Sequence, residues 1–282
     1  MGIKTYRPYT ETRRFQTGLT FEELSASRPH KPLLEPKTRI SGRNNQGKLS
    51  IWHRGGGHKR MYRVIDFKRD KFGIPARVAS VEYDPNRTCF ISLLQYQDGE
   101  KRYILAPFGV TVGDVLESGQ VVEPKPGNCM PLGSIPAGLE VHNIEMTAGQ
   151  GGKMVRGAGG SARIVAKEGD WVTVILPSGE MRMVRKECRA TIGRLGNPEY
   201  QNITIGKAGR MRHLGIRPHV RGKAQNPVDH PLGGGEGRSN GGRHPCSPSG
   251  VLAKGGKTRN PRKVSNSRII RRRKNRQGQT VL

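Results

Sequence analysis

The sequence contains few of the residues from which a large hydrophobic core is built. Of its 282 residues, 33% are hydrophobic and 5% are aromatic, whereas the 39 glycines and 19 prolines make up about a fifth of the chain. The length alone would suit about two compact domains. A single core that spans the whole chain is therefore not expected.

Paired cysteines and long apolar runs are also missing. The four cysteines are widely scattered without a CxxC pair, so neither a disulfide framework nor a zinc ribbon is indicated, and a reducing compartment fits. No apolar run approaches the roughly 20 residues of a membrane span, and the first ten residues lack the apolar core of a signal peptide. Tyr6 stands where a myristoylation pattern needs Ser or Thr. We expect a cytoplasmic protein without a membrane partner.

Acidic residues are also scarce, and the distribution of net charge divides the chain into three segments. Fifty Lys and Arg against 22 Asp and Glu give a formal net charge of +28. Residues 1–60 carry +9, residues 61–206 carry +2 and residues 207–282 carry +17. A chain this basic repels itself unless an anionic partner neutralises it, and a phosphate backbone is the obvious partner. The pattern indicates two cationic flanks around an ordinary balanced fold.

The balanced middle predicts an all-β fold of two small barrels. Short runs rich in β-branched and aromatic residues occur at 61–67, 76–84, 88–96 and 101–106, separated by turn signals. A second set lies within 161–193, with tight turns at EGD and PSGE. Apart from a possible turn at TFEELSA, no segment shows a sustained helical period. We place the boundary near residue 125, which gives domains at 61–124 and 125–206 between a basic extension at 1–60 and another at 207–282.

The C-terminal extension has no Phe, Tyr or Trp in its 76 residues. It therefore lacks the large apolar side chains that offset the ordering entropy of the backbone, about 1–2 kcal/mol per residue. We predict that it is disordered or mobile when free, and a straight chain of this length could reach on the order of 200 Å into a partner. A solvated low-complexity tail is the alternative.

Two glycine-rich motifs are candidate phosphate-binding segments. In HRGGGHKR, residues 53–60, three glycines allow close approach of the backbone while flanking cations bond phosphates and the imidazoles stack or donate. The alternatives are a flexible basic turn or a metal site on its two histidines, and no third metal ligand is nearby. GQGGKMVRGAGGSAR, residues 149–163, does not have the spacing of a nucleotide-binding P-loop. Two interpretations of this motif remain: a backbone cradle for an RNA phosphate, or a plain mobile loop.

The richest motif runs from Arg217 to Lys263 and contains adjacent Asp229 and His230. A carboxylate can orient an imidazole whose pKa lies near neutrality, so this pair suggests acid–base chemistry. No partner nucleophile is evident, and the segment offers no apolar material for a pocket that excludes water. We favour an irregular backbone shaped by RNA, in which Asp229 accepts hydrogen bonds and His230 donates to a phosphate or stacks. The last motif, residues 269–279, is a basic cluster that suits RNA, DNA or a nuclear-import receptor equally.

The predicted RNA ligands share a cationic, hydrogen-bonding, stacking or glycine character within these motifs or beside them. They are Arg39, Arg43, Lys48, Trp52, His53, Arg54, His58, Lys59, Arg60, Lys68, Arg69, Arg87, Lys153, Arg156, Arg163, Lys207, Arg210, Arg212, Arg217, His219, Arg221, Lys223, Asn226, Asp229, His230, Gly233, Gly234, Gly235, Arg238, Arg243, Lys254, Lys257, Arg259, Arg262, Arg271, Arg272, Arg273 and Lys274. We predict no catalytic residue, no metal ligand and no cofactor, and any magnesium would be held through the bound RNA.

Several long motifs, in order, carry a resemblance to a known family. They include GRNNQGKLSIWHRGGGHKRMYRVIDFKRDKFGIPA, VEYDPNRT, GEKRYILAP, KPGN, GKAGRMRHLGIRP and NPVDHPLGGGEGR. Over essentially its whole length the chain resembles the bacterial-type second protein of the large ribosomal subunit. The resemblance implies an OB-fold barrel followed by an SH3-like barrel, with extensions embedded in large-subunit rRNA near the peptidyl-transferase centre and the subunit interface.

The resemblance also implies roles and partners. These are subunit association, tRNA placement and integrity of a catalytic centre whose chemistry is carried by RNA, with contacts to neighbouring ribosomal proteins and the small subunit. The positions of Asp229 and His230 match the loop closest to that centre, where their role is supporting. Leu232 stands where a second histidine is common, and Lys223 and Gln225 flank Ala224 where other residues are frequent. The location implied is the ribosome of the cytoplasm, or of a plastid or mitochondrion if the product is encoded there.

Three functional hypotheses follow from the sequence. A structural rRNA-binding protein is favoured, because glycine-bent irregular arms suit folded RNA. A DNA-compacting protein would read or wrap a duplex with helices, ribbons or repeated basic units. An RNA-directed enzyme would use His230.

Overall fold

The computed structural model describes residues 2–26, 28–38, 41–238, 242–254 and 259–273. The chain forms two compact units. The first, here the barrel unit, comprises residues 1–38, 59–207 and 267–282, and the second, here the arm unit, comprises residues 39–58 and 208–266. These units differ from the four segments predicted from charge and turn signals, because the N-terminal stretch contributes to both units and the two barrels belong to one unit.

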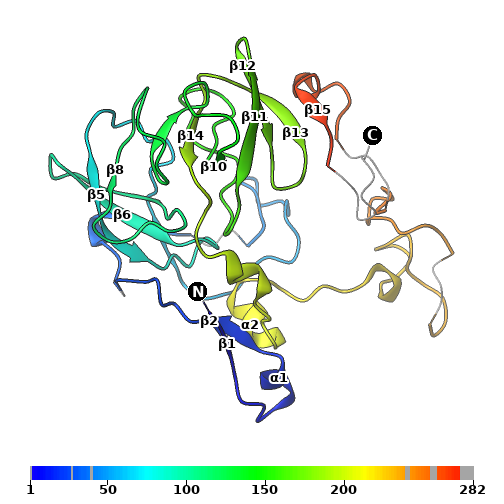
Figure 1. The fold of residues 1–282 in the computed structure, drawn as a ribbon. Coiled ribbons are helices and arrows are strands. Elements are labelled where there is room, and N and C mark those ends of the chain that lie inside the picture. The colour runs from blue at the N-terminus through cyan, green and yellow to red at the C-terminus, as the bar shows by residue number, and fades with distance from the viewer. Residues whose placement is uncertain (1, 27, 39–40, 239–241, 255–258, 274–282) are drawn as a thin grey trace. The chain divides into compact units, whose positions relative to one another are not determined.

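Short strands make up most of the regular structure (Figure 1). In the barrel unit the strands are β1 (Ile3–Thr5), β2 (Thr17–Leu19), β3 (Leu34–Pro36), β4 (Met61–Arg63), β5 (Ala76–Glu82), β6 (Ile91–Tyr96), β7 (Lys101–Leu105), β8 (Val115–Leu116), β9 (Cys129–Pro131), β10 (Glu140–His142), β11 (Ala162–Glu168), β12 (Trp171–Ile175), β13 (Met181–Arg185), β14 (Arg189–Ile192) and β15 (Ile269–Arg271). The helices are α1 (Glu11–Arg14) and α2 (Ala208–His213), with short 3-10 turns at Lys31–Leu33, Pro198–Asn202, Gly222–Ala224 and Val264–Asn266. None of the described helices is long and apolar enough to cross a membrane.

The first barrel is a curled antiparallel sheet in the order β7-β6-β5-β8. Every residue of strand β6 except Gln95 is buried, because both faces of the sheet are covered. Leu94 and Tyr96 belong to one buried cluster, and Ile91 and Leu93 belong to another. Such alternation follows from the two-residue period of a strand, and each buried aliphatic side chain contributes roughly 1.5–3 kcal/mol. The N-terminal residues Leu19 and Leu24 pack against the first cluster.

The second barrel is a curled sheet in the order β15-β13-β12-β11-β10-β14-β9. Its interior is a single cluster that includes Ile135, Val141, Ile164 and Val174. The turns predicted at EGD and PSGE connect β11 to β12 and β12 to β13, as Figure 1 shows. The all-β fold of two small barrels is therefore confirmed.

A strand from near the C-terminus completes the edge of this second sheet. β15 pairs antiparallel with β13, so that Arg271 lies opposite Met181 and Ile269 lies opposite Arg182. The beginning of the predicted basic cluster at 269–279 is thus part of the barrel unit. Lys274 and the residues after it lie outside the described part of the chain.

Candidate nucleic-acid interface

The arm unit has the composition of a polyanion-binding segment. It carries 16 Lys and Arg against 2 Asp and Glu, so about a quarter of the chain holds half of the net charge of +28. None of its described residues belongs to a cluster of buried hydrophobic side chains. Its shape therefore depends on backbone hydrogen bonds and turns.

The arm unit brings two of the predicted cationic segments together. Residues 53–58 run alongside residues 213–217, where the amide of Gly55 donates to Gly215 O at 3.0 Å and that of His58 donates to His213 O at 2.9 Å. Arg217 N in turn donates to His53 O at 3.0 Å. The HRGGGHKR motif and the start of the C-terminal extension are thus one local structure, which sequence spacing does not reveal.

Glycine is required at the centre of this pairing. Gly57 has a φ of +84°, and a Cβ there would lie 2.9 Å from both Cα and N of Gly215. Positive φ and so close a backbone approach both favour glycine. Gly215 itself has a φ of +87° and follows α2, where its amide donates to Arg212 O at 3.0 Å. The glycines therefore allow the backbones of these two segments, which carry cationic side chains, to lie against each other.

The loop around the Asp229–His230 pair closes on itself. The His230 ring is buried, and its Nδ1 accepts from Leu232 N at 3.0 Å. A Cβ on Gly222 would lie 2.4 Å from Cε1 of this ring, so Gly222 leaves the space that the imidazole fills. The Gly234 amide donates to Gln225 O at 3.1 Å and joins the two ends of the loop. His230 is accordingly a packed residue of the loop.

Asp229 does not orient that imidazole. Its side chain is exposed, and no hydrogen bond joins it to His230 among the described residues. The acid–base pair considered from the sequence is therefore not assembled in this geometry. Contacts within the protein already explain why Gly233 and Gly234 are glycines. A Cβ on Gly233 would lie 2.4 Å from Gln225 O, and one on Gly234 would lie 2.7 Å from Pro227 Cγ. Their contact with RNA stays a prediction.

The glycine-rich loop at 149–163 presents side chains rather than backbone amides. The buried Glu145 carboxylate accepts from Gly151 N at 2.8 Å and from Gly149 N at 3.3 Å. Gly152 N donates to Phe67 O at 2.8 Å. Because these donors are engaged within the protein, the predicted backbone cradle for a phosphate is wrong for this part of the loop. Lys153 is exposed, and its Nζ donates to Gln150 Oε1 at 2.6 Å. Its contact with a phosphate stays a prediction.

Aromatic rings on the barrel unit lie beneath several arginines. The Arg156 guanidinium lies 4.5 Å from the centroid of Phe67, and the Arg189 guanidinium lies 3.6 Å from that of Phe72. Arg268 lies 4.7 Å from the centroid of Trp171. The ring quadrupole attracts a guanidinium in this position by about 0.5–1 kcal/mol at an exposed site. Arg189 and Arg268 are not among the predicted ligands, because they stand outside the glycine motifs, although Arg268 is adjacent to the C-terminal basic cluster.

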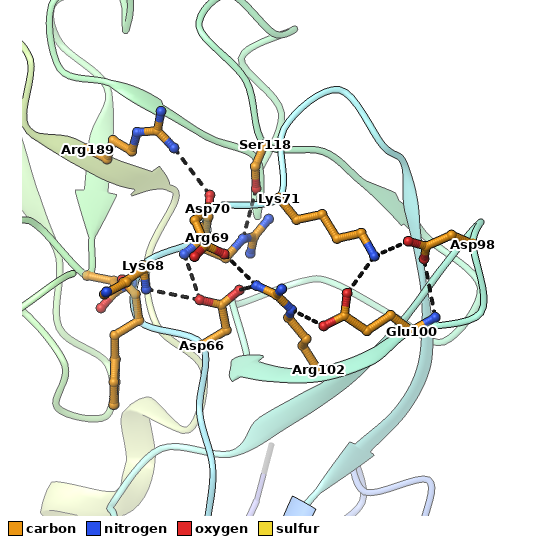
Figure 2. Close-up of polar contacts among 12 residues, drawn as sticks. Asp66, Lys68, Arg69, Asp70, Lys71, Asp98, Glu100, Arg102, Ser118 and Arg189 are labelled. Atoms are coloured by element: carbon orange, nitrogen blue, oxygen red, sulfur yellow. Dashed lines mark hydrogen bonds and ion pairs between the residues drawn. The ribbon is translucent and has the colours of Figure 1, made fainter. Parts of the chain in front are cut away.

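Most of the predicted ligands are exposed or half-exposed, but Arg69 is buried, as His230 is. Arg69 is 2% exposed, and its Nε donates to Ser118 Oγ at 3.0 Å (Figure 2). Its terminal nitrogen donates to Gly127 O at 3.3 Å. Arg69 therefore connects the two barrels from within, and the predicted RNA contact is corrected to this structural role. Arg87 is largely covered as well, and its Nε lies 2.5 Å from the buried carboxylate of Asp84.

The remaining predicted ligands fall into three groups. Those in the arm unit are Arg43, Lys48, Trp52, His53, Arg54, His58, Arg210, Arg212, Arg217, His219, Arg221, Lys223, Asn226, Asp229, Gly235, Arg238, Arg243, Lys254, Arg259 and Arg262. Those in the barrel unit are Lys59, Arg60, Lys68, Lys153, Arg156, Arg163, Lys207, Arg271, Arg272 and Arg273. Arg39, Lys257 and Lys274 lie outside the described residues.

An ion-pair network neutralises one face of the first barrel. Figure 2 shows the Arg102 guanidinium between three carboxylates, with Asp70 at 2.5 Å, Glu100 at 2.6 Å and Asp66 at 3.1 Å. Lys71 bridges Asp98 and Glu100. Hydrogen bonds from Arg102 and then Lys71 hold the pKa of Glu100 below its ordinary value. This face is unsuited to a phosphate backbone, because its cations are already paired.

Metal-binding geometry is not found in the described part of the chain. No group of three or more His, Cys, Asp or Glu side chains there could hold an ion. All four cysteines are free, and burial raises the pKa of the Cys89 thiol to about 11.

Two family models match the chain. One, described as ribosomal proteins L2, RNA binding N-terminal domain, matches residues 30–118, and the other, described as ribosomal proteins L2, C-terminal domain, matches residues 125–250. Together they span about three quarters of the chain. The second match extends from the second barrel into the arm unit and includes the loop of His230.

Proposed function

The chain belongs to the family of ribosomal proteins L2 and is a structural, rRNA-binding constituent of the large ribosomal subunit; from this premise we propose that the arm unit is the part embedded in folded rRNA. The observation that carries the proposal is the exposed cation density on a glycine-jointed backbone without a hydrophobic core. The self-repulsion of such a segment is relieved when phosphates neutralise it.

The finer assignments are proposals of the same kind. We propose a bacterial-type member in which the loop of Asp229 and His230 approaches the peptidyl-transferase centre and supports its geometry, while RNA carries the chemistry. Support for subunit association and tRNA placement, contacts with neighbouring ribosomal proteins and the small subunit, and magnesium bound through rRNA belong to the same proposal. So does location in the cytoplasm, with an organelle ribosome as the alternative. The lack of a hydrogen bond between Asp229 and His230 argues against an enzymatic role for the pair.

Salt dependence of binding tests the proposal for the arm unit. A full-length variant with Arg217, Arg221 and Lys223 replaced by Gln should bind a transcript of its large-subunit rRNA with a shallower log–log salt slope. The slope should fall by about 2, because each lost phosphate contact contributes roughly 0.7–0.9.

A matched variant replaces Lys125, Lys167 and Lys186 by Gln and removes the same net charge from the barrel unit. Each of these lysines already contacts a protein oxygen at 2.7 Å, in Glu123, Gly133 and Asp170 respectively. Its salt slope should stay close to that of the parent protein. Equal slopes for all three proteins would show that Arg217, Arg221 and Lys223 do not contact phosphates, which contradicts the proposal.

A further inference from the structure

The arm unit contains a cavity of about 500 Å³. This volume lies within the range of roughly 300–1,000 Å³ that is typical of small-ligand sites. Its lining includes Trp52, His53, His219, Gln225 and His230, all from the arm unit. The inference drawn from it rests on the proposed function, because it concerns how the same unit binds RNA.

Flat, apolar surfaces form much of the wall. Trp52 is the single Phe, Tyr or Trp in the sequence of the arm unit, and its side chain is half-exposed and not packed into a core. Beside it, the rings of His53 and His219 meet edge to face with centroids 4.5 Å apart, and their nitrogens lie 2.7 Å apart. Leu232 adds an aliphatic surface. Such a wall suits a planar aromatic ligand.

Polar groups at the cavity match the edge of a nucleobase. Because Nδ1 of His230 accepts from Leu232 N, the neutral ring carries its hydrogen on Nε2 and can donate from there. The side-chain amide of Gln225 has no hydrogen-bond partner among the described residues and offers both a donor and an acceptor. Exposed Arg221 and Lys223 also border the cavity, where a phosphate attached to such a ligand would lie.

We propose that this cavity receives one unstacked nucleobase from a single-stranded segment of RNA. Trp52 stacks on the base, Gln225 and His230 face its hydrogen-bonding edge, and Arg221 and Lys223 contact the flanking phosphates. Sequence-specific RNA recognition commonly uses splayed bases in this way, on aromatic and guanidinium surfaces. A free nucleoside is the competing occupant.

Fluorescence of Trp52 provides the test. In full-length protein with Trp171→Phe, Trp52 is the only tryptophan. The probes are four RNA pentamers, UUNUU with each base at the centre, and the same pentamer with an abasic central ribose. At least one base-bearing pentamer should quench Trp52 and bind about 5- to 150-fold more tightly than the abasic pentamer, the range expected for stacking of one base.

Three variants separate stacking from electrostatics. Trp52→Ala removes the fluorescent reporter, so its binding is followed by the fluorescence anisotropy of end-labelled pentamers. It should lower the affinity for that pentamer to the abasic level without changing the salt slope, because no phosphate contact is lost. Gly222→Ala should also abolish the preference, since its Cβ would lie 2.4 Å from the His230 ring. Val228→Ala is the matched control, because Val228 is 92% exposed and is not part of the cavity lining, and it should bind as the parent does.

The other possible results contradict either the cavity assignment or the proposed function on which it rests. Equal affinity for base-bearing and abasic pentamers, with a steep salt slope retained, would overturn the cavity assignment and leave rRNA binding by the arm unit intact. Competition by free adenosine as strong as that by the pentamer would identify a small-molecule site and also overturn it. A shallow salt slope for binding to rRNA itself would contradict the proposed function, the binding of rRNA phosphates by the arm unit, on which this inference rests.

Discussion

Replacing Glu145 by Ala should destabilise the protein and release the glycine-rich loop that follows β10. The Glu145 carboxylate is 1% exposed. It accepts from the amides of Gly151 at 2.8 Å, Arg189 at 3.0 Å and Gly149 at 3.3 Å. It is the acceptor for two amides of this loop, which also carries Lys153.

The magnitude follows from the donors that the substitution leaves without an acceptor. A buried donor without a partner costs about 1–3 kcal/mol. The Gly151 amide is fully buried, whereas those of Gly149 and Arg189 are only partly buried and regain some hydration. We therefore expect a loss of about 3 kcal/mol, a large part of a typical unfolding free energy of roughly 5–15 kcal/mol.

Urea unfolding gives the free energy, and amide hydrogen exchange at Gly149 and Gly151 reports the loop. Glu140→Ala is the matched control, because that carboxylate is exposed and accepts from Ser161 Oγ at 3.0 Å. It should change stability by no more than about 0.5 kcal/mol. If Glu145→Ala lost less than about 1 kcal/mol and left both amides as protected as before, the buried carboxylate would not organise the loop.

Two further perturbations have defined outcomes. Burial lowers the pKa of His142 to about 4 from 6.5, so the unfolded chain takes up the proton first and stability falls as pH decreases from about 6.5 towards 4. Urea unfolding should show a loss of about 2 kcal/mol between roughly pH 7.5 and 5 that His142→Asn removes, and equal pH slopes in both proteins would contradict this. Gly57→Ala should weaken rRNA binding at least about tenfold (~1.4 kcal/mol) by forcing a Cβ to 2.9 Å from Gly215, with the urea midpoint of the barrels unchanged. Gly56→Ala is the control, because Gly56 also has a positive φ but a Cβ there would meet nothing within 4 Å, so that only backbone strain is introduced. An equal loss of affinity in both variants would show that the contact of the new Cβ with Gly215 is irrelevant.

The two barrels could be predicted because their signals are local. Alternation of apolar residues and tight glycine turns occur within a few residues of each other. The predicted strands at 61–67, 76–84, 88–96 and 101–106 contain β4, β5, β6 and β7. By contrast, the packing of Leu19 and Leu24 on the first barrel joins segments far apart in the sequence. Charge counting assigned those leucines to a basic extension.

The candidate interface was predicted in its residue types more fully than in its roles. Positive charge and glycine mark a polyanion-binding chain regardless of its shape. Whether a cation faces inward depends on tertiary structure, so Arg69 was taken for a surface ligand although its guanidinium connects two barrels. The amides of Gly149 and Gly151 were taken for a phosphate cradle because Glu145, their acceptor, gives no signal of its burial in the sequence.

Amide hydrogen exchange of the arm unit, free and bound to rRNA, tests the central claim most directly. The amides of Gly55, His58 and Arg217 hold residues 53–58 against residues 213–217 without a hydrophobic core. If phosphate neutralisation gives this unit its stable shape, these three amides should exchange rapidly in the free protein and become strongly protected in the complex, while Val174 stays protected in both. Strong protection of all three amides in the free, RNA-less protein would contradict the account.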